Sequence, residues 1–424
     1  MKVMIISQRC SAQDPPDNPT LEVRFENLLA HALRDRIQGA IVYKAQDKGE
    51  TKFIRDGITY YPLNCRMDLT LIQEAEWEIT RQKLLRVIEE FSPDIIQCMG
   101  SEWPYGLIAE FVSVPVVIHM MGFLNVYYMA LDMVLGYSVH AFSNSADQTR
   151  ASSIKRKLKH LRIKASDTQE PTVRLSDLLS IRERKILKAA HYYMGRTEWD
   201  RNVVKYYSPG SKYYHVEELL KPRIYEAAGK WEYSYQGGKP LRLLTISSAD
   251  DRKGNEIILR TAYLLKELLG LEFEWHVAGS RDYFDRYEKI TGIHHKDVNV
   301  SLIGYIGVDT VIEELVSADL FIHPSIIDNS SHAICEAQII GCPVIVSYVG
   351  GSMDLVEDKV TGFLYPYNEP HTLAFLIGNL YKEKNVLNKV SANATQTACV
   401  RHDPDRIAQA LYQTYEDIIR DNEK

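Results

Sequence analysis

The sequence has 424 residues, and its 50 lysines and arginines against 56 aspartates and glutamates give a formal net charge of −6. This length favours two domains, and the acidic balance argues against nucleic acid as the main partner. The six cysteines are scattered without any Cys-x-x-Cys pair, which favours reduced thiols over a disulfide framework or a zinc site.

The longest apolar stretch, residues 120–142, is interrupted by glycine, asparagine, aspartate and histidine. It falls short of the ~20 apolar residues that a membrane-spanning helix needs. Residues 1–7 are too short an apolar run for a signal peptide and are typical of a first strand. We therefore expect a cytoplasmic protein, either free in solution or peripheral on the inner face of the membrane.

Strand and helix patterns alternate along the first half of the chain, as they do in βαβ units. Strands are predicted at 3–7, 40–44, 58–62, 94–98, 116–119, 189–195 and 213–216, and helices at 21–36, 69–91 and from the N-cap Thr197 onward. The alternation predicts a parallel sheet covered by helices, which is a Rossmann-like domain.

Residues 152–166 form the one strongly basic run of the chain. Ile154, Leu158 and Leu161 fall at helical spacing among six lysines and arginines. Such a helix fits an anionic membrane surface, or a patch that steers a phosphorylated acceptor, or a solvated face of the first domain. The sequence leaves these three interpretations open.

A polar stretch at 231–240, with two glycines and a proline near its end, separates the two halves and is typical of a linker. Beyond it, strands are predicted at 241–246, 273–279, 298–305, 320–322 and 344–346, and helices at 256–269, 332–340, 371–384 and 404–421. The same alternation predicts a second Rossmann-like domain.

Residues 319–351 read as strand, polar loop, helix and strand, so the loop lies at the carboxyl end of a buried strand, where open α/β sheets bind ligands. The backbone N–H groups at 330–333 open the helix and would suit a phosphate. Asp328 and Glu336, eight positions apart, could accept paired hydrogen bonds from vicinal sugar hydroxyls. On spacing alone, a capping acid and a solvated helix glutamate is the stronger interpretation.

The whole run resembles the donor-binding core of the retaining family 4 glycosyltransferases, which have the GT-B fold. The pieces that carry the resemblance are Asp328-x7-Glu336, Gly341-Cys342-Pro343-Val344, Gly350-Gly351, Asp354 and Thr361-Gly362-Phe363-Leu364. The chain departs from the family twice, because Asp328 replaces a glutamate and Ser247 or Ser248 stands where the family has an arginine.

The resemblance implies an α/β protein with two Rossmann-like domains facing across a cleft. It implies an acceptor-binding domain at 1–236, a domain at 239–402 that binds the nucleotide sugar, and a C-terminal helix at 403–424 that crosses back onto the first domain.

The resemblance also implies roles for single residues. Lys253 would stabilise the departing diphosphate, Asp328 would hold the transferred sugar, and His119 would assist from the first domain. Glu336 would bind the ribose. The remaining implied donor contacts are Arg252, Gly304, Tyr305, Asn329, Ser330 and Ser331, and the implied acceptor contacts are Arg196 and Glu217 or Glu218, for which a buried ion pair is an equal explanation.

The implied reaction is the retaining transfer of a hexose from a UDP- or GDP-sugar to a hydroxyl of a glycan or lipid-linked acceptor, in surface polysaccharide or glycoconjugate synthesis. No cofactor or metal is expected, since side chains and helix dipoles serve the diphosphate in this fold. Two alternatives remain: a non-catalytic subunit that binds sugar nucleotides, and a GT-B epimerase or phosphorylase. A dinucleotide-dependent oxidoreductase is disfavoured because no Gly-x-Gly-x-x-Gly follows a strand.

Overall fold

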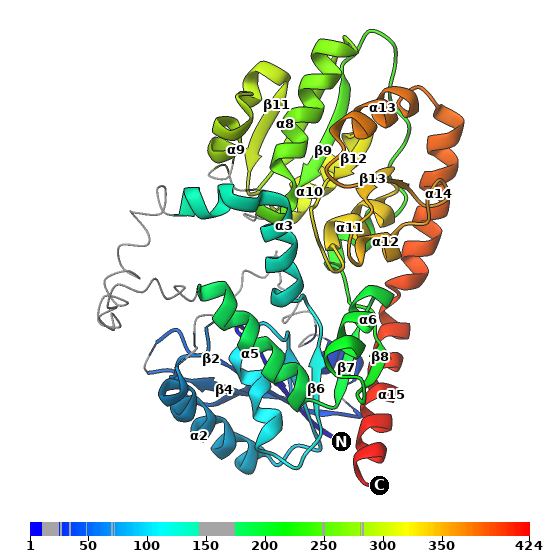
Figure 1. The fold of residues 1–424 in the computed structure, drawn as a ribbon. Helices are drawn as coiled ribbons and strands as arrows, with labels where there is room; N and C mark the ends of the chain where they lie inside the picture. The colour runs from blue at the N-terminus through cyan, green and yellow to red at the C-terminus, as the bar shows by residue number, and fades with distance from the viewer. Residues whose placement is uncertain are drawn as a thin grey trace, which may run out of the picture.

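The computed structural model describes residues 1–10, 25, 28–33, 35–47, 49–68, 71, 73–143, 174–247, 251–279, 281 and 284–424. It contains two predominantly parallel sheets, each flanked by helices and each built from one half of the chain (Figure 1). The basic run at 152–166 lies outside the described residues. The expected α/β fold with two Rossmann-like domains is confirmed.

The first sheet has the strand order β3-β4-β2-β1-β5-β6-β7-β8, and only the β3–β4 pair is antiparallel. Its strands are β1 (Lys2–Ile6), β2 (Gln38–Lys44), β3 (Phe53–Arg55), β4 (Ile58–Leu63), β5 (Ile95–Met99), β6 (Val116–His119), β7 (Tyr192–Gly195) and β8 (Lys212–His215). The central strands are buried on both faces, which explains their nearly continuous apolar sequences.

The helical segments of the first half are η1 (Leu28–Ala32), α2 (Glu74–Phe91), η2 (Pro104–Glu110), α3 (Leu124–Ser143), α5 (Leu175–Ala189) and α6 (Glu198–Tyr207). Helix α2 begins five residues later than predicted, with Glu74 and Glu76 in its first turn. Helix α3 takes up most of the apolar stretch at 120–142. Within the described residues, every helix is too short or too polar to cross a membrane.

The second sheet is entirely parallel, in the order β11-β10-β9-β12-β13-β14. Its strands are β9 (Leu241–Ile246), β10 (Phe273–Ala278), β11 (Val300–Gly304), β12 (Leu320–His323), β13 (Val344–Ser347) and β14 (Phe363–Tyr365). The helical segments around it are α7 (Pro222–Glu226), η4 (Asp251–Lys253), α8 (Asn255–Tyr263), η5 (Leu264–Leu268), α9 (Phe284–Thr291), η6 (His295–Val298), α10 (Val308–Ser317), α11 (His332–Ile340), α12 (Ser352–Leu355) and α13 (Pro370–Leu380).

Two predictions for the second half were incomplete. The helix predicted at 256–269 divides into α8 and a π-helical turn, η5. Helix α14 (Lys384–Arg401) was not predicted at all. Its buried face relies partly on the small residues Ser391, Ala394 and Ala398, so its apolar periodicity in the sequence is weak.

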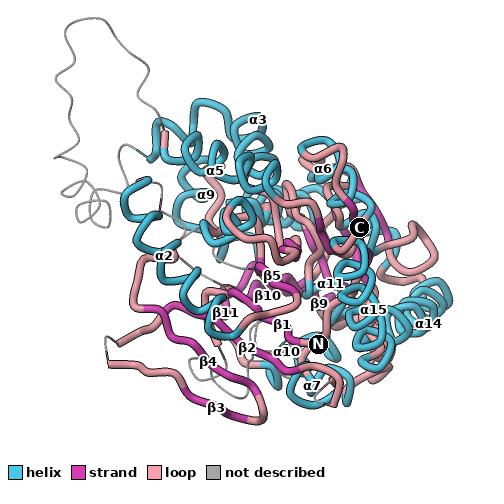
Figure 2. Tube along the Cα trace, turned by 90° about the horizontal axis from the view of Figure 1, so that it is seen from below, coloured by secondary structure: helices cyan, strands magenta, loops and turns pink. Residues whose placement is uncertain are grey.

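The C-terminal helix α15 (Pro404–Asn422) crosses back onto the first domain, as expected. Ile407, Leu411 and Ile418 join Val3 and Ile5 in one first-domain core. Helix α2 packs on the other face of the same sheet, and Figure 2 shows α2 and α15 on opposite sides of it. The N-cap predicted at Asp403 is confirmed, since its side chain accepts the Arg406 N–H.

The connection between the sheets belongs mostly to the second domain. Leu220, Ile224, Ala227 and Trp231 all pack in the second core, ahead of the boundary predicted at 236. The exact domain boundaries stay a prediction.

Candidate functional site

The carboxyl ends of the central strands of both sheets meet at the junction of the two domains. β6 and β7 end at His119 and Gly195, and β12 ends at His323. Side chains that follow these strand ends contact each other directly across the junction. This is the position at which open α/β sheets bind ligands.

On the second-domain side, Lys253 and Asp328 form a nearly buried ion pair. Lys253 Nζ lies 2.5 Å from Asp328 Oδ2, and their side chains are 12% and 11% exposed. Burial would raise the pKa of Asp328, but the Lys253 ammonium and the hydrogen bond from His323 hold it well below its usual value. Asp328 is therefore ionised at neutral pH.

Two glycines allow the backbone to close tightly around this pair. Gly254 has φ +72°, and a Cβ there would lie 1.9 Å from the carbonyl oxygen of Pro324. Gly350 has φ +51°, and a Cβ there would lie 2.0 Å from the carbonyl oxygen of Asp328. Only glycine fits both positions. Steric exclusion of a side chain therefore explains the glycine of Lys253-Gly254 and the first glycine of Gly350-Gly351.

On the first-domain side, the carboxylate of Glu218 is fully buried and has three partners. Its Oε1 lies 2.8 Å from His119 Nε2, and its Oε2 lies 2.8 Å from Arg196 Nη1 and 2.7 Å from His332 Nε2. Burial would raise the pKa of Glu218, but the guanidinium and the two imidazoles lower it well below its usual value. We call these four residues the Glu218 cluster.

Further contacts join the domains around the Glu218 cluster. Arg196 Nη2 donates to the carbonyl oxygen of Ser330 at 2.6 Å, and Thr197 Oγ1 donates to Asn329 Oδ1 at 3.1 Å. The backbone N–H of Trp199, in the first turn of α6, donates to Asp354 Oδ2 at 3.0 Å. The predicted N-cap Thr197 is confirmed by its bond from the Asp200 N–H.

Arg252 reaches the first domain as well. Its guanidinium carbon lies 3.9 Å from the ring centroid of Tyr127 on α3, a cation–π contact. Adjacent Lys253 points to Asp328 instead. The two neighbouring cations therefore serve different partners, one in each domain.

Several buried polar atoms at the junction have no hydrogen-bond partner among the described residues. Asn329 Nδ2 and Ser330 Oγ are such atoms in the loop before α11, and His119 Nδ1 is one in the first domain. Unsatisfied buried groups are costly, and their concentration here is typical of a ligand site.

The structure places the other predicted donor residues as follows. Ser331 is the N-cap residue of α11. Glu336 is buried in α11, with Oε1 3.6 Å from Lys221 Nζ. Gly304 ends β11 with φ +75°, and Tyr305 beside it is 75% exposed. Their roles in donor binding stay predictions.

The structure separates the two adjacent glutamates that were predicted as alternative acceptor contacts. Glu217 contacts His215 Nε2 at 2.9 Å, outside the Glu218 cluster, whereas Glu218 pairs with the predicted Arg196. The buried ion pair weighed as an alternative for these residues is present. Sequence reasoning missed His332 and His323, since a histidine beside a helix start or strand end has no distinctive spacing.

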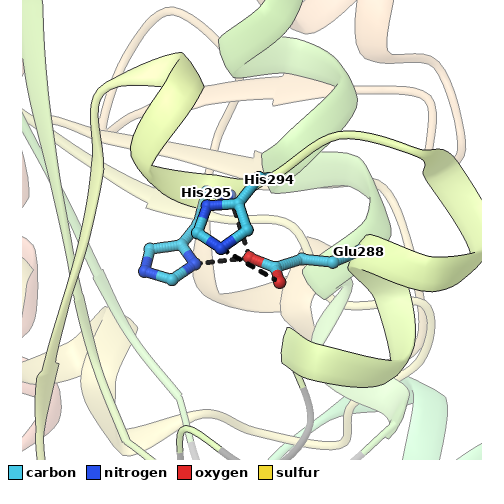
Figure 3. Close-up of side chains that lie close together, drawn as sticks. All are labelled: Glu288, His294 and His295. Atoms are coloured by element: carbon cyan, nitrogen blue, oxygen red, sulfur yellow. Dashed lines mark hydrogen bonds and ion pairs between the residues drawn. The ribbon is translucent and has the colours of Figure 1, made fainter.

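A second group of titratable side chains lies away from this junction. Glu288, His294 and His295 come together at the end of α9 (Figure 3). Glu288 Oε1 accepts the backbone N–H of His295 at 2.9 Å, and Oε2 lies 3.7 Å from His294 Nε2. His294 Nδ1 accepts the Lys296 N–H at 3.3 Å, which places the proton of the neutral ring on Nε2. A metal ligand needs a bare nitrogen there, so the arrangement fits a loop held by hydrogen bonds better than a metal site.

The second half of the chain matches a known family. Residues 234–397 match the family model described as glycosyl transferases group 1. The match covers 164 of the 424 residues, less than half of the chain. Similar curated proteins include an uncharacterized glycosyltransferase of Methanocaldococcus jannaschii, 27% identical over 41% of this chain and 44% of its own length. The amylovoran biosynthesis glycosyltransferase AmsK of Erwinia amylovora is 28% identical over 33% of this chain and 35% of its own length. The chain thus spans less than half the length of these relatives.

Solved glycosyltransferase structures are similar in fold to the whole chain, beyond the residues that match the family model. Sucrose-phosphate synthase from Thermosynechococcus elongatus superposes with a TM-score of 0.70 at 14% identity, over 99% of both chains. HepE of Anabaena in complex with UDP and glucose superposes with a TM-score of 0.63 at 16% identity, over 98% of this chain and 99% of its own. The chain therefore has the GT-B fold, and the residues that match the family model form its second half.

Proposed function

We propose that the chain is a retaining glycosyltransferase of family 4 that moves a hexose from a UDP- or GDP-sugar to a hydroxyl of a glycan or lipid-linked acceptor. The observation that carries this proposal is the Lys253–Asp328 pair at the start of α11, facing the Glu218 cluster across the domain junction. It puts a cation, a carboxylate and a helix N-terminus in one place.

Each of these groups suits one part of a nucleotide sugar. Lys253, together with the backbone N–H groups at the start of α11, stabilises negative charge on the departing diphosphate. Asp328 accepts hydrogen bonds from hydroxyls of the transferred sugar once Lys253 moves to the phosphate. Asn329 Nδ2 and Ser330 Oγ, buried and without partners in the described part of the chain, supply further polar contacts.

Retention follows if the acceptor hydroxyl attacks the face from which the diphosphate leaves, and this route needs no enzymic nucleophile. We assign Glu336 to the ribose, Gly304 and Tyr305 to the base, and Arg196 to the acceptor side. Side chains and the α11 dipole take the place of a bridging metal in this proposal.

The comparisons support the donor and the biological setting. HepE has been solved with UDP-glucose, which favours a UDP-sugar as donor here. AmsK and the putative colanic acid biosynthesis glycosyltransferase WcaL of Escherichia coli act in polysaccharide synthesis by name. We therefore propose a role in polysaccharide or glycoconjugate synthesis, with the basic run at 152–166 as the segment that would approach an anionic membrane.

The deciding experiment measures thermal stability against UDP, GDP, ADP and CMP, each with magnesium and with EDTA. A nucleotide at about 100 times its dissociation constant stabilises by about 2.7 kcal/mol. We expect one nucleoside diphosphate to do so equally with magnesium and EDTA, and much less in Lys253→Ala and Glu336→Ala. Lys389→Ala, the same charge change on the exposed face of α14, should respond like the wild type.

The outcomes separate the alternatives. If no nucleotide stabilises the protein, the donor site is wrong, and if EDTA abolishes the shift, metal independence is wrong. Binding without any donor turnover would favour a non-catalytic subunit. Donor conversion that never consumes an acceptor hydroxyl would favour an epimerase or phosphorylase.

A further inference from the structure

In the Glu218 cluster, two histidines bind the carboxylate of Glu218 in addition to its ion-pair partner Arg196. His119 arrives from the end of β6, Arg196 from the end of β7, and His332 from the first turn of α11 in the other domain. Glu218 itself follows β8 by three residues. The two oxygens of one carboxylate thus bind three side chains that come from both domains.

The contacts of this cluster determine which nitrogen of His119 carries the proton. Glu218 is ionised and Arg196 carries a permanent positive charge, so the pair is already neutral. A proton on Nδ1 would be a buried N–H group without an acceptor among the described residues. His119 donates to Glu218 through Nε2–H, because an ionised carboxylate only accepts hydrogen bonds.

That assignment leaves Nδ1 of His119 as a bare acceptor. It is buried and has no partner among the described residues, while the Phe25 ring lies edge-on at 4.8 Å between ring centroids. We infer that Glu218 is a positioning residue, which holds His119 in its Nε2–H form so that Nδ1 accepts a hydrogen bond from a substrate hydroxyl. This inference rests on the proposed function and deepens it, since it assigns a hydroxyl donor to that nitrogen.

The contact with His332 ties this arrangement to the second domain. Glu218 Oε2 binds His332 Nε2 at 2.7 Å, one residue beyond the N-cap of α11. The carboxylate that orients His119 therefore has all of its contacts only when α11, the helix proposed to bind the donor, is docked against the first domain. The side chain of Glu218 thus fixes the position of His119 relative to the start of α11.

The first test reads the tautomer of His119 without any substrate. In the full-length chain labelled with ¹⁵N-histidine, the signal of His119 is assigned by its loss in His119→Gln. We expect a protonated Nε2 and an unprotonated Nδ1 at neutral pH in the wild type, and loss of this single form in Glu218→Gln. Glu183→Gln, an isosteric change at another fully buried glutamate of the first domain, should leave the His119 signal unchanged.

The second test separates turnover from binding. Glu218→Gln should lower kcat for donor turnover by roughly 10- to 100-fold with little change in the donor KM, because a misplaced contact acts mainly on the transition state. His119→Gln keeps an N–H donor where Nε2 was and removes the Nδ1 acceptor. It should fold like the wild type and lose turnover to a similar degree, which covers the case that Glu218→Gln does not fold.

Three results would overturn the inference: a wild-type His119 protonated on Nδ1 or on both nitrogens, an unchanged tautomer in Glu218→Gln, or full turnover in His119→Gln. A wild type that binds no nucleotide would instead overturn the proposed function. The tautomer measurement still decides the role of Glu218 in that case.

Discussion

His402 shows how burial of a single residue makes stability depend on pH. It is fully buried at the junction of α14 and α15, and its Nδ1–H donates to the carbonyl oxygen of Glu218 at 2.9 Å. Burial lowers its pKa from 6.5 to about 4. Between these values the unfolded chain binds the proton and the folded chain does not, so stability falls as pH drops from 6.5 towards 4.

We therefore predict a loss of roughly 3 kcal/mol from this one group across that window, which corresponds to the size of the pKa change. The urea midpoint measured from pH 7 to pH 4 should fall more steeply in the wild type than in His402→Gln. His371→Gln, a change at an exposed histidine of α13, serves as the control and should keep the wild-type slope. Equal slopes in all three proteins would contradict the prediction.

At the scale of an element, α15 ties the end of the chain to the first domain. Leu411 is fully buried in the same core as Val3 and Ile5, and Tyr192 Oη donates to Asp421 at 2.9 Å. Leu411→Ala should cost about 2–5 kcal/mol, because it removes buried methyl groups and leaves a cavity. Chemical denaturation followed by tryptophan fluorescence would measure it. Gln413→Ala, on the exposed face of the same helix, should change stability by less than about 0.5 kcal/mol.

At the scale of the whole molecule, a few polar contacts hold the domains together. Asp354 accepts the Trp199 N–H, and Tyr127 covers the Arg252 guanidinium. Each contact contributes only about 1 kcal/mol, and domain movement is the default for interfaces of this kind. The double change Asp354→Ala and Tyr127→Leu should therefore increase the radius of gyration in small-angle scattering. Glu313→Ala, an exposed acid of α10, is the charge-matched control, and an unchanged radius in the double variant would contradict the prediction.

Local patterns in the sequence predicted most strands within one or two residues. The reason is that central parallel strands are apolar on both faces, as in Val116–His119 and Leu241–Ile246, and that caps such as Thr197 and Asp403 mark helix starts. Helix α14 escaped because small residues form part of its buried face. Its packing against α11, rather than its own periodicity, makes it helical.

The sequence by itself determined the two-domain α/β fold, the strand–loop–helix unit that contains Asp328 and Glu336, and the loop after a strand that contains Lys253. Those features depend on residues close together in the chain, whose spacing a pattern can express. Only the tertiary structure decided that Glu218, rather than Glu217, joins His119 and His332, since these three residues lie 99 and 114 positions apart. Contacts of that kind follow from how two sheets present their carboxyl edges to each other, and no local spacing encodes them.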